Sequence, residues 1–189
     1  MKAFFGRYGY TALKLFLDQF AIALFGVGLS FACAGAGNNT LLIITSIGAV
    51  LFYLFLQYAV MWEIGAKDGI SATAKGQSRG LWRGFVIGLI GNALNLLCAL
   101  CILPGAFVEN GFSKAFMFIG RMVQGMYMGL LAQPFMGLKL HDYAWVYFVI
   151  FLPSVLLCGV AYIIGSYNLH ATNILIPKNK DVKNNGRPE

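Results

Sequence analysis

Three long stretches of the chain contain no charged side chain, and no other feature of the sequence limits its possible folds as strongly. The stretches lie between Asp18 and Glu63, between Arg83 and Glu109, and between Asp142 and His170. Each can hold a span of roughly 20 apolar residues, the length of a helix that crosses a bilayer, and the first can hold two. Lipid offers the backbone no hydrogen-bond partner, and the runs lack dyad alternation, so they predict helices rather than a barrel.

Composition leads to the same fold class. The 189 residues are 59% hydrophobic and 11% charged, and a soluble domain of this size cannot hide so much apolar surface. We therefore expect an all-α integral membrane protein, a helical bundle with four to five transmembrane helices. No cleavable signal peptide is expected, because the first apolar run continues as a full-length span instead of ending at a small-residue cleavage site.

The expected membrane domain covers residues 17–166, after a basic and aromatic interfacial segment, 1–16, and before a polar tail, 167–189. The clear spans within it are about 17–34, 40–62, 84–103 and 143–166. Glycines and asparagines at 35–39 predict a tight turn between the first two spans. A polar loop with turn-forming Gly65 and Gly69 is expected from Glu63 to Arg83.

Residues 115–136 are ambiguous, because they are long enough to cross a bilayer yet contain Arg121, Gln124 and Gln133. An arginine near the centre of a span costs roughly 3 kcal/mol on insertion scales. Apolar length favours a fifth span. The positive-inside rule favours four, because an even number of crossings places the basic N-terminus, the 63–83 loop and the basic tail together in the cytoplasm.

Six polar side chains form the candidate membrane site, because polar groups at that depth need either protein partners or water. They are Asp18, Asn92, Asn95, Arg121, Gln124 and Gln133. The asparagines either make interhelical hydrogen bonds that hold the bundle together or line a polar cavity for a solute. Arg121 either snorkels to the interface, pairs with Asp18 or Glu109, or meets an anionic ligand.

Small residues spaced four apart predict close helix packing. They are Gly26, Ser30, Gly84, Gly88, Gly125 and Gly129. The cysteines lie within or beside apolar runs, and Cys98 and Cys101 have no second pair or nearby histidine to complete a metal site. We therefore expect no metal and no cofactor.

Two motifs in and after the second span resemble a known group of proteins. They are S-I-x-x-x-L-F-Y at Ser46 to Tyr53 and W-E-x-G-A-K-D at Trp62 to Asp68. The run from Thr40 to Gly69 is similar to small, uncharacterised bacterial polytopic membrane proteins with no established activity. The resemblance implies a bacterial inner membrane setting and supplies no catalytic residue.

The sequence contains no H-E-x-x-H or Walker motif, so we do not expect an enzyme. Basic clusters beside spans are the usual orientation signal and do not indicate nucleic-acid binding. The leading hypothesis is a small transport or transport-accessory subunit with a cytoplasmic N-terminus. The alternative is a non-transporting assembly or regulatory protein. Expected partners are the lipid bilayer and either another membrane protein or a second copy of this chain.

Overall fold

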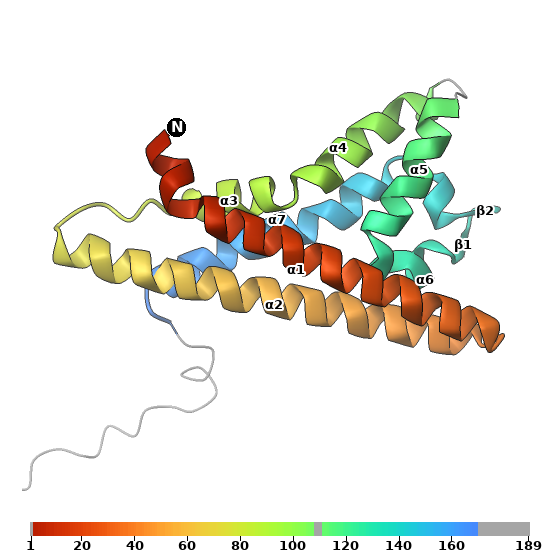
Figure 1. The fold of residues 1–189 in the computed structure, drawn as a ribbon, viewed down its shortest axis with the longest axis horizontal. Helices are drawn as coiled ribbons and strands as arrows, with labels where there is room; N and C mark the ends of the chain where they lie inside the picture. Colours follow the sequence, from red (N-terminus) through yellow and green to blue (C-terminus); the bar gives the residue numbers. More distant parts are fainter. Residues whose placement is uncertain (1, 108–110, 170–189) are drawn as a thin grey trace, which may run out of the picture.

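The computed structural model describes residues 2–107 and 111–169 of the chain (Figure 1). The fold is all-α, as predicted, apart from one hairpin of two short strands. The helices are α1 (Lys2–Gly35), α2 (Asn39–Ala74), α3 (Arg83–Gly91), α4 (Ala93–Ile102), α5 (Gly111–Val123), α6 (Met128–Leu131) and α7 (Val146–Ser166). The remaining elements are the 3-10 turns η1 (Leu103–Ala106), η2 (Gly125–Tyr127) and η3 (Leu140–Asp142) and the antiparallel strands β1 (Pro134–Phe135) and β2 (Leu138–Lys139). The predicted tail lies outside the described residues from position 170 onward.

The long helices run between two ends of the molecule (Figure 1). The basic end holds the start of α1, the end of α2, the start of α3 and the end of α7. The turn end holds the α1–α2 turn and the β hairpin. Helices α2 and α7 run in the same direction, because Gly65 packs on Tyr162 and Gly69 packs on Ser166. Helix α1 therefore begins at the basic end, and helix α7 ends there.

The turn between α1 and α2 has a clear local cause. Gly37 adopts a φ of 65°, the left-handed conformation that commonly follows the end of a helix. The Asn38 side chain then accepts a hydrogen bond of 3.0 Å from the backbone N–H of Leu41 and caps the start of α2. The chain reverses within a few residues, and α1 and α2 pack as an antiparallel pair.

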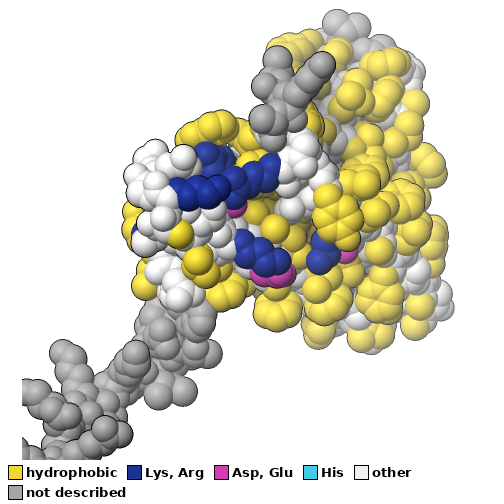
Figure 2. Space-filling view, turned by 60° about the vertical axis from the view of Figure 1, so that its left-hand side comes forward, with side chains coloured by type: hydrophobic (Ala, Val, Ile, Leu, Met, Phe, Trp, Pro, Cys, Tyr) yellow, Lys and Arg dark blue, Asp and Glu magenta, His cyan; other side chains and the backbone are white. Residues whose placement is uncertain are grey.

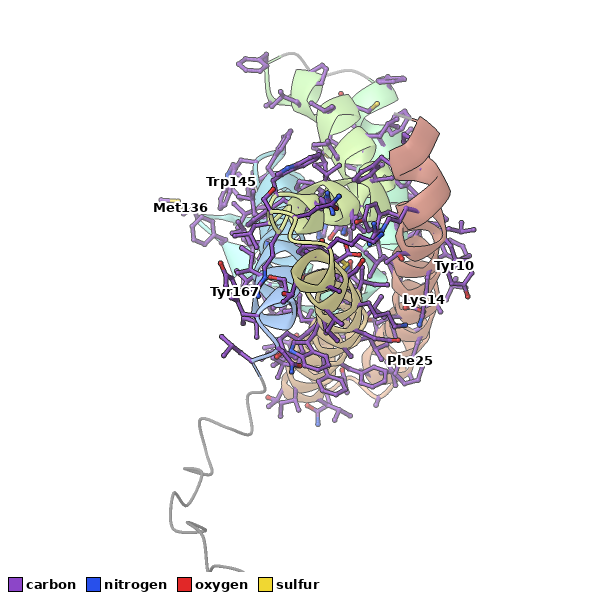
Figure 3. All side chains as sticks on the ribbon, turned by 90° about the vertical axis from the view of Figure 1, so that its left-hand side faces the viewer. Tyr10, Lys14, Phe25, Met136, Trp145 and Tyr167 are labelled. Carbon is purple, nitrogen blue, oxygen red and sulfur yellow. The ribbon has the colours of Figure 1, made fainter. Side chains whose placement is uncertain are left out.

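Among the described residues, three helices are long and apolar enough to cross a membrane, namely α1 from Phe4 onward, α2 and α7. A fourth crossing would be a broken one, because α3 and the α4–η1 segment are bent by 64° relative to each other. Apolar side chains cover much of the bundle surface (Figure 2). Phe25 and Trp145 point away from the bundle on opposite sides (Figure 3). An exposed apolar surface of this extent is typical of proteins that contact lipid or another apolar partner.

Two helices extend beyond the predicted spans. The segment 1–16 is not separate from the first span, since α1 is continuous from Lys2 and buries Tyr8 and Leu15 in the bundle core. The predicted loop after Trp62 is helical as far as Ala74. The charged residues of this segment do not end the helix. Lys67 donates to Glu63 over 2.5 Å, and the two residues lie one helical turn apart on an exposed face, where such a pair stabilises a helix.

Gly65 and Gly69 are not turn residues but positions of close contact between α2 and α7. A Cβ atom at Gly65 would lie 2.2 Å from the carbonyl oxygen of Tyr162, and one at Gly69 would lie 2.1 Å from that of Ser166. From the other side, a Cβ at Gly165 would lie 2.1 Å from the carbonyl oxygen of Trp62. We call Gly65, Gly69 and Gly165 the glycine interface. Only glycine lets the two backbones approach this closely.

The ambiguous stretch 115–136 does not form one continuous helix. Helix α5 ends at Val123, and the chain then turns back through η2 and α6. Gly125 packs on Ala23 of α1, and Gly129 packs on Ser46 of α2. The Gln133 side chain bonds Asn39 at the start of α2, 3.3 Å away. The segment therefore folds as a helical hairpin, and its end at Gln133 lies beside the start of α2 at the turn end.

Candidate functional site

The two predicted asparagines lie at the break between α3 and α4. Asn92 is the residue between the helices, and its Nδ2 donates to the carbonyl oxygen of Gly88 over 2.9 Å. Asn95 Nδ2 lies 3.3 Å from Asn92 Oδ1. The first bond satisfies a carbonyl group at the bend, which matters because an unpaired backbone group in an apolar interior costs several kcal/mol.

Side chains from three other helices complete a buried polar network around these asparagines. Gln19 Nε2 of α1 donates to Asn95 Oδ1 over 2.7 Å. The Tyr53 hydroxyl of α2 donates to Asn92 Oδ1 over 2.9 Å. The Ser154 hydroxyl of α7 lies 3.0 Å from Asn92 Oδ1 and 2.7 Å from Gln57 Oε1. We call Gln19, Tyr53, Gln57, Asn92, Asn95 and Ser154 the break network, and each of its members is at most 2% exposed.

The break network ties α1, α2 and α7 to the bend between α3 and α4. This arrangement corresponds to the interhelical hydrogen bonds that the sequence allowed as one alternative for Asn92 and Asn95. Four of the six members were not predicted as site residues. Gln19 and Gln57 could have been predicted from the sequence, because each is an amide side chain within a long apolar run. Tyr53 and Ser154 could not, because tyrosine and serine are common in membrane helices.

Asp18, a predicted site residue, does not join this network. It is half-buried on α1, and within the described part of the chain it makes no hydrogen bond or ion pair. The predicted pair with Arg121 is therefore not formed, and the other predicted partner, Glu109, lies outside the described residues. Gln19 faces the interior instead, because one residue along an α-helix rotates a side chain by about 100°.

A second break lies one helical turn farther along α1, where Gln124 separates α5 from η2. Gln124 is 2% exposed. The backbone at the break packs tightly on α1, since a Cβ at Gly125 would lie 2.2 Å from the carbonyl oxygen of Ala23. The hydroxyl of Tyr127 and the Oε1 of Gln19 are buried and have no hydrogen-bond partner among the described residues. Gln133, in contrast, lies at the turn end with Asn39 and is not part of this buried region.

A pocket of about 370 Å³ opens beside α5 at the turn end. The residues that line it are Gly105, Ser113, Lys114, Met117, Arg121, Leu138, His141 and Asp142. Lys114, Met117 and Arg121 are three and four residues apart, so α5 presents them on one face. We call this cavity the Arg121 pocket. Its lining includes three side chains that can be cationic, Lys114, Arg121 and His141, and one acid, Asp142.

Arg121 lies in the wall of the pocket with incomplete hydrogen bonding. Its Nε is buried and has no hydrogen-bond partner within the described chain. Its guanidinium carbon lies 5.9 Å from the centre of the Phe118 ring, a weak cation–π contact. A buried N–H donor without an acceptor is costly, so this atom is the strongest sign in the pocket of a missing partner.

The other side of the pocket is held by His141 and Tyr147. The Nδ1 of His141 donates to the carbonyl oxygen of Leu131 over 2.9 Å, since a carbonyl can only accept. Its Nε2 lies 3.4 Å from Asp142 Oδ1. The Tyr147 hydroxyl lies 3.2 Å from the carbonyl oxygen of His141 and 3.3 Å from that of Met117. These bonds fix η3 against α5 and so keep the pocket walls in place.

A separate cluster closes the bundle at the basic end around Asp68, which was not among the predicted site residues. Asp68 is 8% exposed. Its carboxylate pairs with Arg7 and accepts hydrogen bonds from the hydroxyls of Tyr8, at 2.5 Å, and Tyr162, at 2.6 Å. Arg83 donates to the Tyr8 hydroxyl over 3.3 Å. The Asp68 cluster thus joins α1, α2, α3 and α7.

The predicted packing residues lie at helix contacts. Gly26 packs on Met126, and Gly84 and Gly88 pack on Tyr162 and Cys158 of α7. Gly125 and Gly129 hold the α5–α6 hairpin against α1 and α2, as described above, and Ser30 is 4% exposed. No group of three or more potential metal-binding side chains occurs among residues 2–107 and 111–169.

Comparisons of the chain with protein-family models, with curated proteins and with solved structures found no match.

Proposed function

We propose that this chain is a small transport or transport-accessory subunit of a bacterial inner membrane and that it captures an anionic solute in the Arg121 pocket. The observation that carries the proposal is the buried, unpartnered Nε of Arg121 in the wall of a cavity of about 370 Å³. An anionic oxygen in the pocket would supply the acceptor that this donor lacks. Lys114 and His141 also line the pocket.

Two broken helices support a solute-handling role. In many transporters, helices interrupted at membrane depth surround the substrate site, because their exposed backbone groups must face protein or a cavity. Here the chain is broken at Asn92 and at Gln124, and both breaks pack on the same part of α1, at Gln19 and Ala23. Arg121 lies one helical turn before the second break. A solute bound at Arg121 would therefore lie beside the buried polar region.

Replacing Arg121 with Gln tests this proposal. We expect the variant to lose binding of small anions by about tenfold or more, the effect of removing one charge-assisted hydrogen bond. Its thermal unfolding midpoint without ligand should stay close to wild type, because Arg121 makes no ion pair in the described chain. The measurement is a thermal-shift titration of the purified full chain with phosphate, sulfate and small carboxylates.

The matched control is Lys139→Gln, which removes a positive charge at the turn end without altering the lining of the pocket. It should retain wild-type affinity. Equal affinity in the two variants would contradict the proposal, as would a wild-type protein that none of these anions stabilises.

We further infer a topology of four crossings with a cytoplasmic N-terminus. The bent α3–α4 pair would cross with α1, α2 and α7, and the α5–α6 hairpin would leave on the side from which it enters. Two features support this inference. The start of α1 and the end of α7 both lie at the basic end (Figure 1), and that end carries Lys75, Arg79 and Arg83, as the positive-inside rule requires of a cytoplasmic side.

Single cysteines on opposite ends test the orientation. Ser78 and Asn38 are both exposed, the first at the basic end and the second at the turn end. A membrane-impermeant maleimide added to intact cells should label Asn38→Cys and leave Ser78→Cys unlabelled until the membrane is opened. The unsubstituted chain gives the background, since three of its four cysteines are buried. The reverse labelling pattern would refute the orientation.

A further inference from the structure

A groove with a volume of about 370 Å³ opens between the ends of α2 and α7 at the basic end. Its walls are mainly apolar or small. They comprise Ala66, Gly69, Ile70, Thr73 and Ala74 from α2, Arg79 from the following loop, and Ser166, Tyr167 and Asn168 from the end of α7. Ile70 is 65% exposed and Tyr167 is 50% exposed, so the apolar wall continues onto the outer surface. Figure 3 shows Tyr167 pointing away from the bundle.

Arg79 supplies the positive charge in this groove. Its guanidinium carbon lies 4.5 Å from the centre of the Tyr167 ring. Its Nη2 donates to Thr73 Oγ1 over 3.3 Å. These contacts orient the guanidinium at the groove and use only part of its five N–H donors. No acid pairs with Arg79 within the described chain. The remaining donors have the geometry that binds phosphate oxygens.

The charges around the groove are complementary to an anion. Lysines and arginines gather at this end of the molecule (Figure 2). The acids nearby are already paired, Glu63 with Lys67 and Asp68 with Arg7. The net field at the groove is therefore positive, and it attracts anionic groups at the membrane surface.

We propose that this groove binds one anionic phospholipid, with the phosphate on Arg79 and an acyl chain along Ile70 and Tyr167. The apolar wall selects this occupant, because a free phosphate would contact Arg79 and leave that wall uncovered. The proposal does not depend on the Arg121 pocket, which lies at the other end of the molecule. It assigns a separate ligand to a separate site.

Short-chain lipids test the proposal on the purified full chain in a neutral detergent. The thermal unfolding midpoint is followed during titration with dihexanoyl phosphatidylglycerol, with dihexanoyl phosphatidylcholine and with inorganic phosphate. We expect a saturable rise with the phosphatidylglycerol and little change with the other two. Arg79→Gln should raise the half-saturating concentration roughly tenfold, which corresponds to the loss of one charge-assisted hydrogen bond.

Two further variants keep the test decisive. Lys75→Gln removes the same charge from the same loop but does not line the groove, so it should change the half-saturating concentration less than twofold. Ala74→Trp fills the groove and keeps all charges, and it should weaken binding at least as much as Arg79→Gln. Equal effects of Arg79→Gln and Lys75→Gln would show general surface attraction and overturn the proposal. A rise of the same size with phosphate alone, or unchanged binding in Ala74→Trp, would overturn it as well.

Discussion

Replacing Gly65 with Ala should destabilise the protein strongly. The new Cβ would lie 2.2 Å from the carbonyl oxygen of Tyr162, and a backbone atom cannot move away as the tip of a side chain can. Helices α2 and α7 would have to separate along the glycine interface. Overpacking of this kind costs about 1–3 kcal/mol, and we expect the upper part of that range. Unfolding of the purified chain by heat or by denaturing detergent measures it.

Gly48→Ala is the matched control, because Gly48 is on the same helix and a Cβ there would meet no atom within 4 Å. Its effect should stay within about 1 kcal/mol, the difference in helix propensity between the two residues. If Gly65→Ala and Gly48→Ala are equally stable, the close approach of α2 and α7 is wrong.

Replacing Asp68 with Ala should produce the second large loss of stability. The hydroxyls of Tyr8 and Tyr162 are buried and would lose their common acceptor, and each unsatisfied buried group costs about 1–3 kcal/mol. Arg7 adds little to this sum, because its side chain is 50% exposed and water can replace the lost partner. We expect a total of about 3 kcal/mol, measured by the same unfolding experiments.

Asp18→Ala provides the comparison, since Asp18 is an acid on a neighbouring helix without a hydrogen bond or ion pair in the described chain. Its stability should lie within about 0.5 kcal/mol of wild type. Asp68→Asn should fall between the two alanine variants, because the amide oxygen can still accept a hydrogen bond from a tyrosine. A loss in Asp18→Ala as large as that in Asp68→Ala would contradict the assigned role of the Asp68 cluster.

Local composition predicted the fold class and the turn after α1, because both depend on neighbouring residues. Long uncharged runs make helices, and glycine beside asparagine makes a turn. The same local reasoning failed at Gly65 and Gly69, which follow Trp62 and Glu63 and so have the composition of a loop. Their role depends on Tyr162 and on α7, about a hundred residues away, and no local pattern contains that information.

The candidate site was predicted only in part for a related reason. Asn92, Asn95, Arg121 and Gln124 are polar residues in apolar runs, and the structure places all four in the buried polar region or in the pocket wall. Asp18 lies outside the break network and Gln19 was missed, because the rotation of a helix about its axis decides which of two adjacent polar residues faces inward. That rotation is set by packing between helices, which the charge pattern of one helix does not determine.

The parallel pairing of α2 with α7 also has a consequence for synthesis. In the proposed membrane topology, the ribosome delivers α2 long before α7, so the newly inserted α2 would wait in the bilayer without its main neighbour. During that interval Gln57 and Tyr53 lack Ser154, and the bare backbone at Gly65 and Gly69 is uncovered. A polar face of this kind is unfavourable in hydrocarbon. The proposed topology therefore requires that α2 be sheltered during insertion, by the insertion machinery or by α1, until α7 arrives.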